Sequence, residues 1–146
     1  ALKSGHDYVL FWDADVSIPD PSFIEKLLET AFRFDAKIVG GAYKIREPDK
    51  DKYPVAFVKD GIVENLTEIK QPMLVDRCGT GIMLVHRDVL HKVKDPFFTI
   101  IDGKNLEVEP EDFYFCRRAQ EKGFKIAVDS RFETRHIGPR AWVHLP

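Results

Sequence analysis

The chain has little cysteine, no long apolar run and no marked excess of either charge. Its two cysteines, Cys78 and Cys116, are too few for a disulfide framework and favour a reducing, cytoplasmic setting. The apolar stretches are far too short to cross a bilayer, and no signal-peptide pattern opens the chain. The formal net charge of −2 comes from 22 basic and 24 acidic side chains, so no strong field indicates nucleic acid as a partner.

The composition indicates a folded domain. Hydrophobic residues make up 44% and charged residues 32% of the 146 residues, a balance typical of a globular protein with a real core. The chain begins without Met, and residues 1–5 (ALKSG) are typical of the last turn of a helix closed by a glycine cap. We therefore expect residues 1–146 to form a single partial domain that lacks its N-terminal part.

The periodicity of apolar residues predicts alternating strands and helices. Residues 7–12 are expected to form a strand buried on both faces of a sheet, and Asp20 is the expected N-cap of a helix over 21–34. Asp60-Gly61 predicts a tight hairpin turn. The pattern indicates an α/β fold with a three-layer mixed sheet whose parallel half is incomplete. The other expected elements are strands at 37–39, 55–58, 62–66, 73–75, 81–85 and 125–129, helices at 88–93 and 110–122, and an aperiodic connection over 94–109.

Two aspartates come directly after the first expected strand. Alternate side chains of an extended chain point the same way, so we expect the carboxylates of Asp13 and Asp15 on one side. At the carboxyl end of a strand in an α/β sheet, where ligands bind, they form a hard oxygen site for Mg²⁺ or Mn²⁺. The alternative is a solvated turn in which both carboxylates act as local caps.

A second acidic pair opens the helix expected at 110–122. Glu111 and Asp112 lie in its first turn, where the helix dipole stabilises each carboxylate by about 0.3–1 kcal/mol, and this alone explains them. A carboxylate kept ionised there is also a suitable general base for a hydroxyl nucleophile. The sequence leaves both interpretations open.

Two further motifs are weakly informative in isolation. Gly79 and Gly81 flank Thr80 between two expected strands, where glycines either allow close approach to a ligand or form a plain turn. His136 is either an ordinary side chain or an imidazole that completes a carboxylate pair around Mn²⁺. Cys116 lies on the apolar face of its helix and is expected in the core.

Taken in order, these motifs resemble the family 2 glycosyltransferases of the GT-A fold. The resemblance covers about 8–138, and the motifs follow the family's order with plausible gaps. The matching segments are VLFWDADVSIPDPSFIEKLLE, CGTGIMLVHRDVL, EPEDFYFCRRAQEKGFKIAVDS and TRHIG. Complete members carry a nucleotide-binding half before the D-x-D motif, whereas only twelve residues precede Asp13 here, so the resemblance implies that this half is missing.

The resemblance also implies a role for each motif. Asp13 and Asp15 would hold the nucleoside diphosphate sugar and a Mn²⁺ or Mg²⁺ ion, and His136 would complete the metal sphere. Glu111 and Asp112 match the family's acidic pair, whose Asp acts as the base in inverting members, so Asp112 would be the catalytic base. The loop residues that would lie beside the donor sugar and the acceptor are Gly79, Thr80 and Gly81.

The expected function is metal-dependent transfer of a sugar from that donor to a carbohydrate or another hydroxyl acceptor. Apolar sheet surface left open by a missing half would favour a homo-oligomer, and the missing parts are compatible with peripheral membrane association. One alternative is a haloacid-dehalogenase-like phosphohydrolase, whose first strand also ends in Asp-x-Asp but in which no CGTG element is expected. The other alternative is a non-catalytic carbohydrate- or partner-binding domain that keeps the fold.

Overall fold

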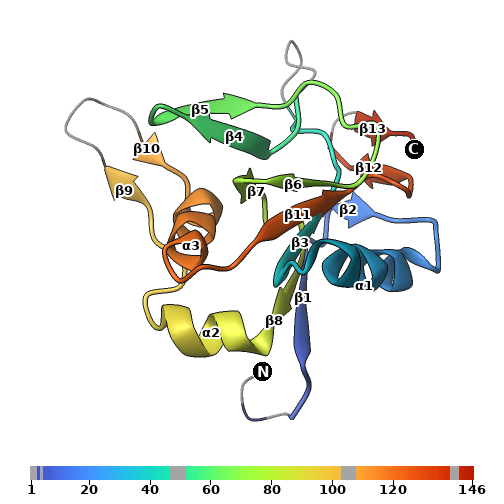
Figure 1. Cartoon of the computed structure of the whole chain (residues 1–146). Coiled ribbons are helices and arrows are strands. Elements are labelled where there is room, and N and C mark those ends of the chain that lie inside the picture. Colours follow the sequence, from blue (N-terminus) through green and yellow to red (C-terminus); the bar gives the residue numbers. More distant parts are fainter. Residues whose placement is uncertain (1–2, 4, 47–51, 103–107, 139–141) are drawn as a thin grey trace.

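A mixed sheet of five strands forms the centre of the computed structural model, which describes residues 3, 5–46, 52–102, 108–138 and 142–146 (Figure 1). In spatial order the strands are β1 (Tyr8–Trp12), β8 (Ile82–His86), β3 (Ile38–Gly41), β11 (Ile126–Asp129) and β6 (Met73–Val75). β3 and β11 run parallel, whereas the other neighbours in this sheet are antiparallel.

Smaller sheets border this centre. The hairpin strands β4 (Val55–Lys59) and β5 (Ile62–Asn65) join β7 (Arg77–Cys78), and β9 (Ile101–Asp102) pairs with β10 (Val108–Glu109). A third small sheet contains β2 (Val16–Ser17), β12 (Thr134–His136) and β13 (Trp142–His144). The pairing of β2 with β12 matters most for function, because it brings the D-x-D segment against the C-terminal tail.

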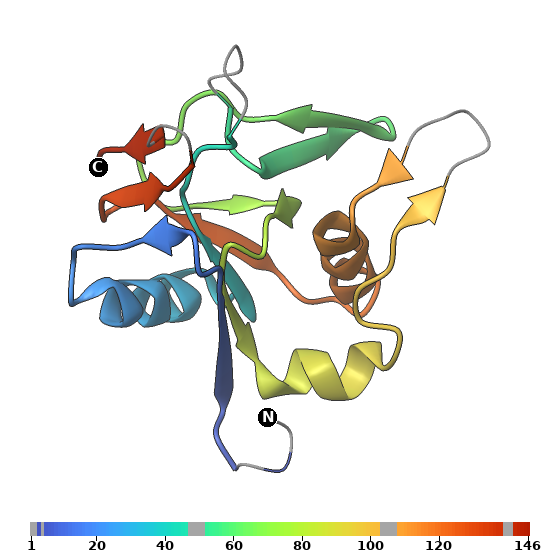
Figure 2. The ribbon, with the colours of Figure 1, turned by 180° about the vertical axis from the view of Figure 1, so that it is seen from behind.

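Helices cover both faces of the central sheet (Figures 1 and 2). α1 (Phe23–Phe34) packs against β3 and β11, whereas α2 (Arg87–Val93) and α3 (Glu111–Gln120) lie on the opposite face. Because side chains alternate along a strand, β8 contributes to the apolar clusters on both faces of the sheet. Met83 and Val85 belong to the cluster with α2 and α3, and Leu84 belongs to the cluster with α1. The expected mixed α/β architecture is confirmed.

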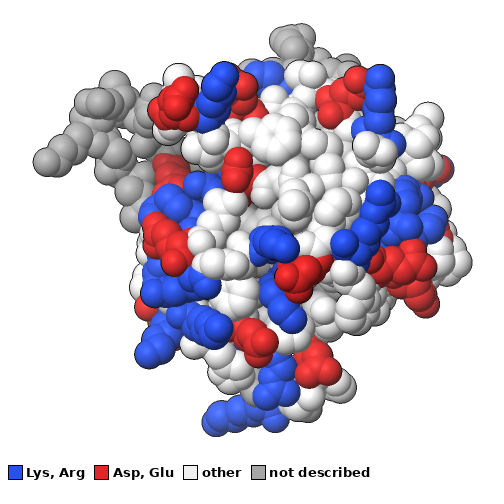
Figure 3. Space-filling model, in the orientation of Figure 1, with Lys and Arg blue, Asp and Glu red and all other residues white. Residues whose placement is uncertain are grey.

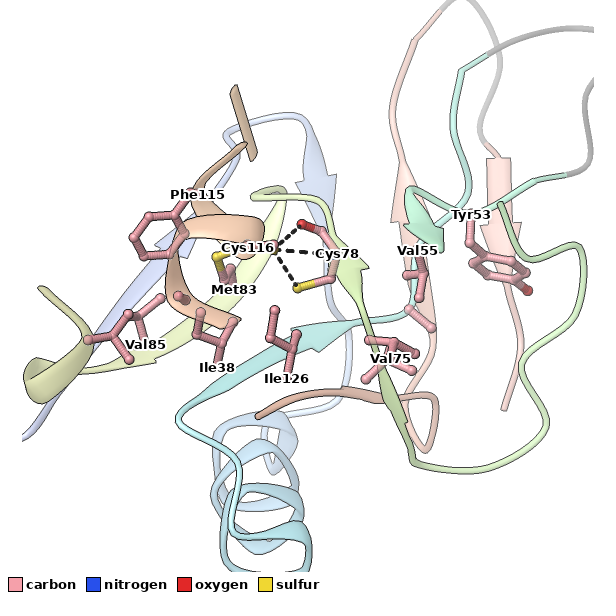
Figure 4. Packing of buried hydrophobic residues seen from close by; sticks show 14 of the residues in the cluster. Ile38, Tyr53, Val55, Val75, Cys78, Met83, Val85, Phe115, Cys116 and Ile126 are labelled. Atoms are coloured by element: carbon pink, nitrogen blue, oxygen red, sulfur yellow. Dashed lines mark hydrogen bonds between the residues drawn. The ribbon is translucent and has the colours of Figure 1, made fainter. Parts of the chain in front are cut away.

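Two cysteines lie in the core between α3 and the sheet (Figure 4). Cys78 of β7 and Cys116 of α3 are buried, with their sulfur atoms 4.0 Å apart. Phe115 and Ile126 belong to the same apolar cluster. Cys116 is therefore a core side chain, as its position on the helix predicts.

The first strand and the first helix differ from expectation. β1 has β8 as its one sheet neighbour among the described residues, so it is an edge strand, and residues 8–11 are half-buried rather than buried on both faces. α1 begins later than expected because Asp20 accepts hydrogen bonds from the Ser22 backbone N–H (2.8 Å) and hydroxyl (2.7 Å). These bonds form a local turn before the helix, and Ser22 rather than Asp20 is the N-cap.

The hairpin prediction is confirmed, and the C-terminal tail contains two strands that were not among the expected elements. Asp60 and Gly61 have φ of 51° and 80°, as a two-residue turn between antiparallel strands requires. The tail forms β12 and β13, which periodicity does not reveal because each spans only three residues. The connection over 94–109 contributes β9 and β10, and its residues 103–107 lie outside the described residues.

The surface mixes both signs of charge. On the face shown in Figure 3, Lys and Arg side chains lie among Asp and Glu side chains. No helix within the described ranges is long and apolar enough to span a membrane.

Candidate functional site

The D-x-D segment forms a tight turn at the carboxyl end of β1. The Val16 N–H donates to the Asp13 carbonyl oxygen at 3.1 Å, and the Trp12 indole N–H donates to the Val16 carbonyl oxygen at 2.7 Å. The chain turns here because it leaves the central sheet in β1 and enters the small sheet in β2. The expected extended geometry, with both carboxylates on one side, is therefore wrong.

Asp15 lies beside His136. β2 and β12 are antiparallel neighbours with Val16 opposite His136, and the Ile137 N–H donates to the Asp15 carbonyl oxygen at 2.7 Å. This pairing places His136 Nε2 3.7 Å from Asp15 Oδ2. The sheet thus brings together two residues from opposite ends of the sequence.

The second ring nitrogen of His136 determines its tautomer. Nδ1 lies 2.8 Å from the Lys44 carbonyl oxygen. A carbonyl oxygen can only accept, so Nδ1 carries a proton, and in the neutral ring Nε2 presents its lone pair on the side of Asp15. Metal-ligating histidines are commonly held by such a backbone carbonyl.

Arg46 contacts the same carboxylate. Its Nη1 lies 2.9 Å from Asp15 Oδ2 and donates to the Ile137 carbonyl oxygen at 3.1 Å. Among the residues that the structure describes, no group of three or more His, Cys, Asp or Glu side chains could hold a metal ion. The structure brings Asp15 and His136 together, while Asp13 is exposed and does not complete a set of three with them.

The donor set of Asp15 and His136 nevertheless fits a cation. One carboxylate and one neutral imidazole are ligands that Mn²⁺ accepts, and they suit Mn²⁺ better than Mg²⁺, which prefers oxygen alone. Two protein ligands leave the remaining positions to water or to the substrate. A cation at this site would therefore need further ligands for tight binding.

Asp112 lies at the N-terminus of α3 in a half-buried position. Its Oδ1 accepts a hydrogen bond from the Phe113 N–H at 2.8 Å. The pKa of Asp112 is raised to about 6, chiefly by burial and to a lesser extent by the neighbouring Glu111, against the opposing effect of backbone N–H groups that include that of Thr80. The Gly79-Thr80-Gly81 loop therefore lies against the Asp112 carboxylate.

Tyr43 contacts both the glycine loop and His136, and the sequence motifs do not indicate it. Its hydroxyl oxygen accepts a hydrogen bond from the Gly81 N–H at 3.0 Å, and its ring meets the His136 ring edge-on with centroids 5.5 Å apart. Burial raises the pKa of Tyr43, and the negative charges of Asp112 and Asp13 add to the rise. Asp112 and Asp13 thus both lie within electrostatic range of this buried phenol.

The glycines of the loop make room for this tyrosine. A Cβ at residue 79 would lie 2.3 Å from the Tyr43 hydroxyl oxygen, and one at residue 81 would lie 2.6 Å from its Cζ. Gly79 and Gly81 are thus required by close packing rather than by positive φ. The only sequence signal for this contact is the G-x-G spacing, which does not name the partner.

A groove runs between the β4–β5 hairpin and the N-terminus of α3. It has a volume of about 530 Å³ and is next to Asp112 along the chain. Its lining is mostly apolar, with a carboxylate and an amide at its edge. The lining residues are Gly61, Ile62, Val63, Asn65, Glu109, Pro110 and Phe113.

The fold and the site define a mixed α/β protein with a carboxylate–imidazole pair and a raised-pKa aspartate around one tyrosine. No protein-family model and no curated protein matches the chain. A solved structure of A197 from STIV is similar with a TM-score of 0.65 and 21% identity, over 97% of this chain and 68% of that one. A structure of apo-UDP-glucose pyrophosphorylase has a TM-score of 0.49 and 14% identity, over 90% of this chain and 50% of that one. The first similarity shows a shared fold alone, and the second is too weak to support an argument.

Proposed function

We propose that the chain is the metal-binding and acceptor-side part of a GT-A-like glycosyltransferase that transfers a sugar from a nucleoside diphosphate sugar to an acceptor hydroxyl. The main supporting observation is the arrangement around Tyr43. Its ring contacts His136, which faces Asp15, and its hydroxyl holds the glycine loop that touches Asp112. The proposed leaving-group site, Asp15 and His136, would thus adjoin the ring of Tyr43, and the proposed base, Asp112, would adjoin the loop that the Tyr43 hydroxyl holds.

Asp112 would act as the base. Its pKa of about 6 keeps it ionised at neutral pH yet more basic than an ordinary aspartate. The carboxylate takes the proton of the acceptor hydroxyl while that oxygen attacks the anomeric carbon. The bond from the anomeric carbon to the diphosphate oxygen breaks, and the configuration inverts. We expect transfer to increase as the pH rises through about 6.

Asp15 and His136 would hold the divalent cation, and Asp13, which lies within electrostatic range of Tyr43, would help to hold the donor. The cation would supply positive charge to offset the charge that develops on the leaving diphosphate. Asp15 would offer a carboxylate oxygen, and His136 would offer the Nε2 lone pair of the tautomer that the Lys44 carbonyl oxygen favours. A cation held there would help to position the donor.

The groove beside α3 would receive the acceptor. Its apolar lining suits the non-reacting body of a substrate, and its position next to Asp112 suits a reacting hydroxyl. Within the described residues β1 is an edge strand of the central sheet, and this edge is compatible with pairing to a further strand.

The decisive experiment is Asp112→Asn in the full-length protein, with Glu111→Gln as the matched neighbour. Product release would be measured over a panel of nucleoside diphosphate sugars and hydroxyl acceptors, and donor binding by calorimetry. We expect Asp112→Asn to lower kcat by a factor of about 100 to 10,000 while donor affinity changes little, because only the base is removed. Glu111→Gln should keep most of the activity.

Three results would contradict the proposal. They are unchanged turnover in Asp112→Asn, loss of donor binding in that variant, and no transfer from any donor. Release of phosphate from phosphate esters in a parallel assay would support the phosphohydrolase alternative. Binding of carbohydrate without turnover would support the non-catalytic one.

A further inference from the structure

Arg46 places a positive charge where the proposed cation would bind. Its Nη1 lies 2.9 Å from Asp15 Oδ2 and 3.1 Å from the Ile137 carbonyl oxygen. The same Asp15 Oδ2 faces His136 Nε2 at 3.7 Å. The guanidinium therefore shares its carboxylate oxygen with the candidate metal ligand set.

The ion pair between Arg46 and Asp15 is easily displaced. Its side chains are 45% and 38% exposed, and an ion pair this open contributes about 0.2–1 kcal/mol. A divalent cation on the same oxygen would repel the guanidinium, because two cations at one carboxylate interact unfavourably at close range. Cation binding and the Arg46 contact therefore exclude each other.

The residues just before Arg46 are anchored at the proposed site, so its backbone would stay near that site if its side chain released Asp15. Two residues earlier, the Lys44 carbonyl oxygen holds His136 Nδ1 at 2.8 Å, and Tyr43 is buried against the glycine loop. The segment that precedes Arg46 is thus held at the proposed site by the Lys44 contact with His136 and by the packing of Tyr43. A guanidinium released here remains within reach of whatever the cation carries, and its planar donors match phosphate oxygens.

We propose that Arg46 holds the place of the divalent cation at Asp15 in the free protein and binds the donor's diphosphate after the cation displaces it. This inference rests on the proposed function. It makes Arg46 a competitor of the metal alone and a partner of the metal–diphosphate pair. Removal of the guanidinium must then change the two affinities in opposite directions.

The test measures Mn²⁺ affinity alone, and UDP and GDP affinity at saturating Mn²⁺, in the full-length protein. Trp12 fluorescence reports the first, since its indole bonds across the D-x-D turn, and calorimetry reports the second. We expect Arg46→Gln to tighten Mn²⁺ binding by about twofold to fivefold, the strength of an exposed ion pair. The same variant should weaken binding of the matching diphosphate by about 10-fold or more, as loss of a charge-assisted hydrogen bond does.

Two variants serve as controls. Arg135→Gln removes a guanidinium next to His136 that bonds to Glu133 instead of Asp15, and it should leave both affinities within about twofold. Arg46→Lys keeps the charge without the planar donors, so its diphosphate affinity should fall between wild type and Arg46→Gln. Thermal unfolding of each variant shows whether the fold is intact.

The failures are distinguishable. If Asp15→Asn abolishes Mn²⁺ binding but Arg46→Gln leaves Mn²⁺ affinity unchanged or weaker, the role of Arg46 is wrong and the metal site stands. If Arg46→Gln tightens Mn²⁺ without weakening UDP or GDP, the diphosphate role is wrong. If Asp15→Asn leaves Mn²⁺ affinity unchanged, the proposed metal site fails and the inference about Arg46 fails with it.

Discussion

The proposed catalytic role of Asp112 coincides with a cost in stability. The folded chain raises its pKa from 3.8 to about 6, mainly by burial, so the folded state binds more protons than the unfolded state between these values. Stability therefore decreases as the pH rises from about 4 to about 6, and the loss persists at higher pH. An ionised carboxylate is held at the site against its preference for water, as a general base requires.

This balance predicts opposite effects on activity and stability. At pH 8, Asp112→Asn should increase the free energy of unfolding by about 2 kcal/mol, because the amide resembles the protonated carboxyl that the site favours. At pH 4 the difference should nearly vanish. Urea unfolding at both pH values measures it, and an equal effect at the two would show that burial does not set the pKa.

Tyr43 and the two loop glycines form a second residue-scale unit. Gly79→Ala would place its Cβ 2.3 Å from the Tyr43 hydroxyl oxygen, with Pro54 also close at 2.9 Å, whereas Gly81→Ala would meet ring carbons of Tyr43. Each should destabilise the fold by about 1–3 kcal/mol.

A double-mutant cycle separates the two contacts. Tyr43→Phe removes the hydroxyl but keeps the ring, so it should recover more of the stability lost in Gly79→Ala than of that lost in Gly81→Ala. In the second case the hydroxyl contact at 2.7 Å is relieved, but Cζ stays 2.6 Å from the added Cβ. Chemical denaturation of the single and double variants measures both couplings. Equal recovery in both backgrounds would contradict the packing argument.

At the scale of elements, α1 is tied to the sheet by a buried polar contact. The Thr30 hydroxyl donates to Asp129 Oδ2 at 2.7 Å, and Arg131 Nη2 lies 2.8 Å from the same oxygen. Asp129 is fully buried at the end of β11, so its carboxylate depends on these partners. The contact fixes α1 beside the parallel pair of strands.

Thr30→Val should cost about 1–3 kcal/mol, because it leaves a buried carboxylate oxygen with one partner fewer while conserving shape. Thr30→Ser keeps the hydroxyl and loses only a methyl group, so it should cost about 1 kcal/mol. Thermal unfolding of the pair measures the difference. Equal losses would assign the effect to packing and not to the hydrogen bond.

At the scale of the whole molecule, stability is expected to be greatest in the middle of the central sheet. β8, β3 and β11 are covered on both faces, whereas β1 is a half-buried edge. Local opening requires less energy where backbone groups have one neighbouring strand.

Hydrogen exchange should therefore be slowest in the three central strands and clearly faster for the amides of β1 that do not bond to β8. Exchange followed by NMR at constant pH resolves this by residue. Uniform protection across β1 would mean that its outer edge is covered in solution, by a second copy or by preceding residues.

Local patterns alone predicted much of the fold. The Asp60-Gly61 turn, the core position of Cys116 and most strands and helices follow from signals within a few residues, because backbone propensity and amphipathic spacing act over that range. The candidate aspartates, loop and histidine were found by motif, and their roles stay predictions. The three-residue strand β6 was expected, whereas β2, β7, β9, β10, β12 and β13, each of two or three residues, were missed because so short a segment carries little periodicity.

The sequence by itself determined which chemical groups this protein has: carboxylates after a strand and at a helix start, a glycine loop and a late histidine. Only the tertiary structure decided which of them meet. The β2–β12 pairing brought Asp15 to His136, while the turn after β1 left Asp13 outside that pair. Tyr43 and Arg46 also reach the site through contacts with residues distant in the sequence. Contacts between distant segments depend on sheet register and core packing. Both are set by how the apolar side chains of the whole chain are buried together, and a local motif does not specify them.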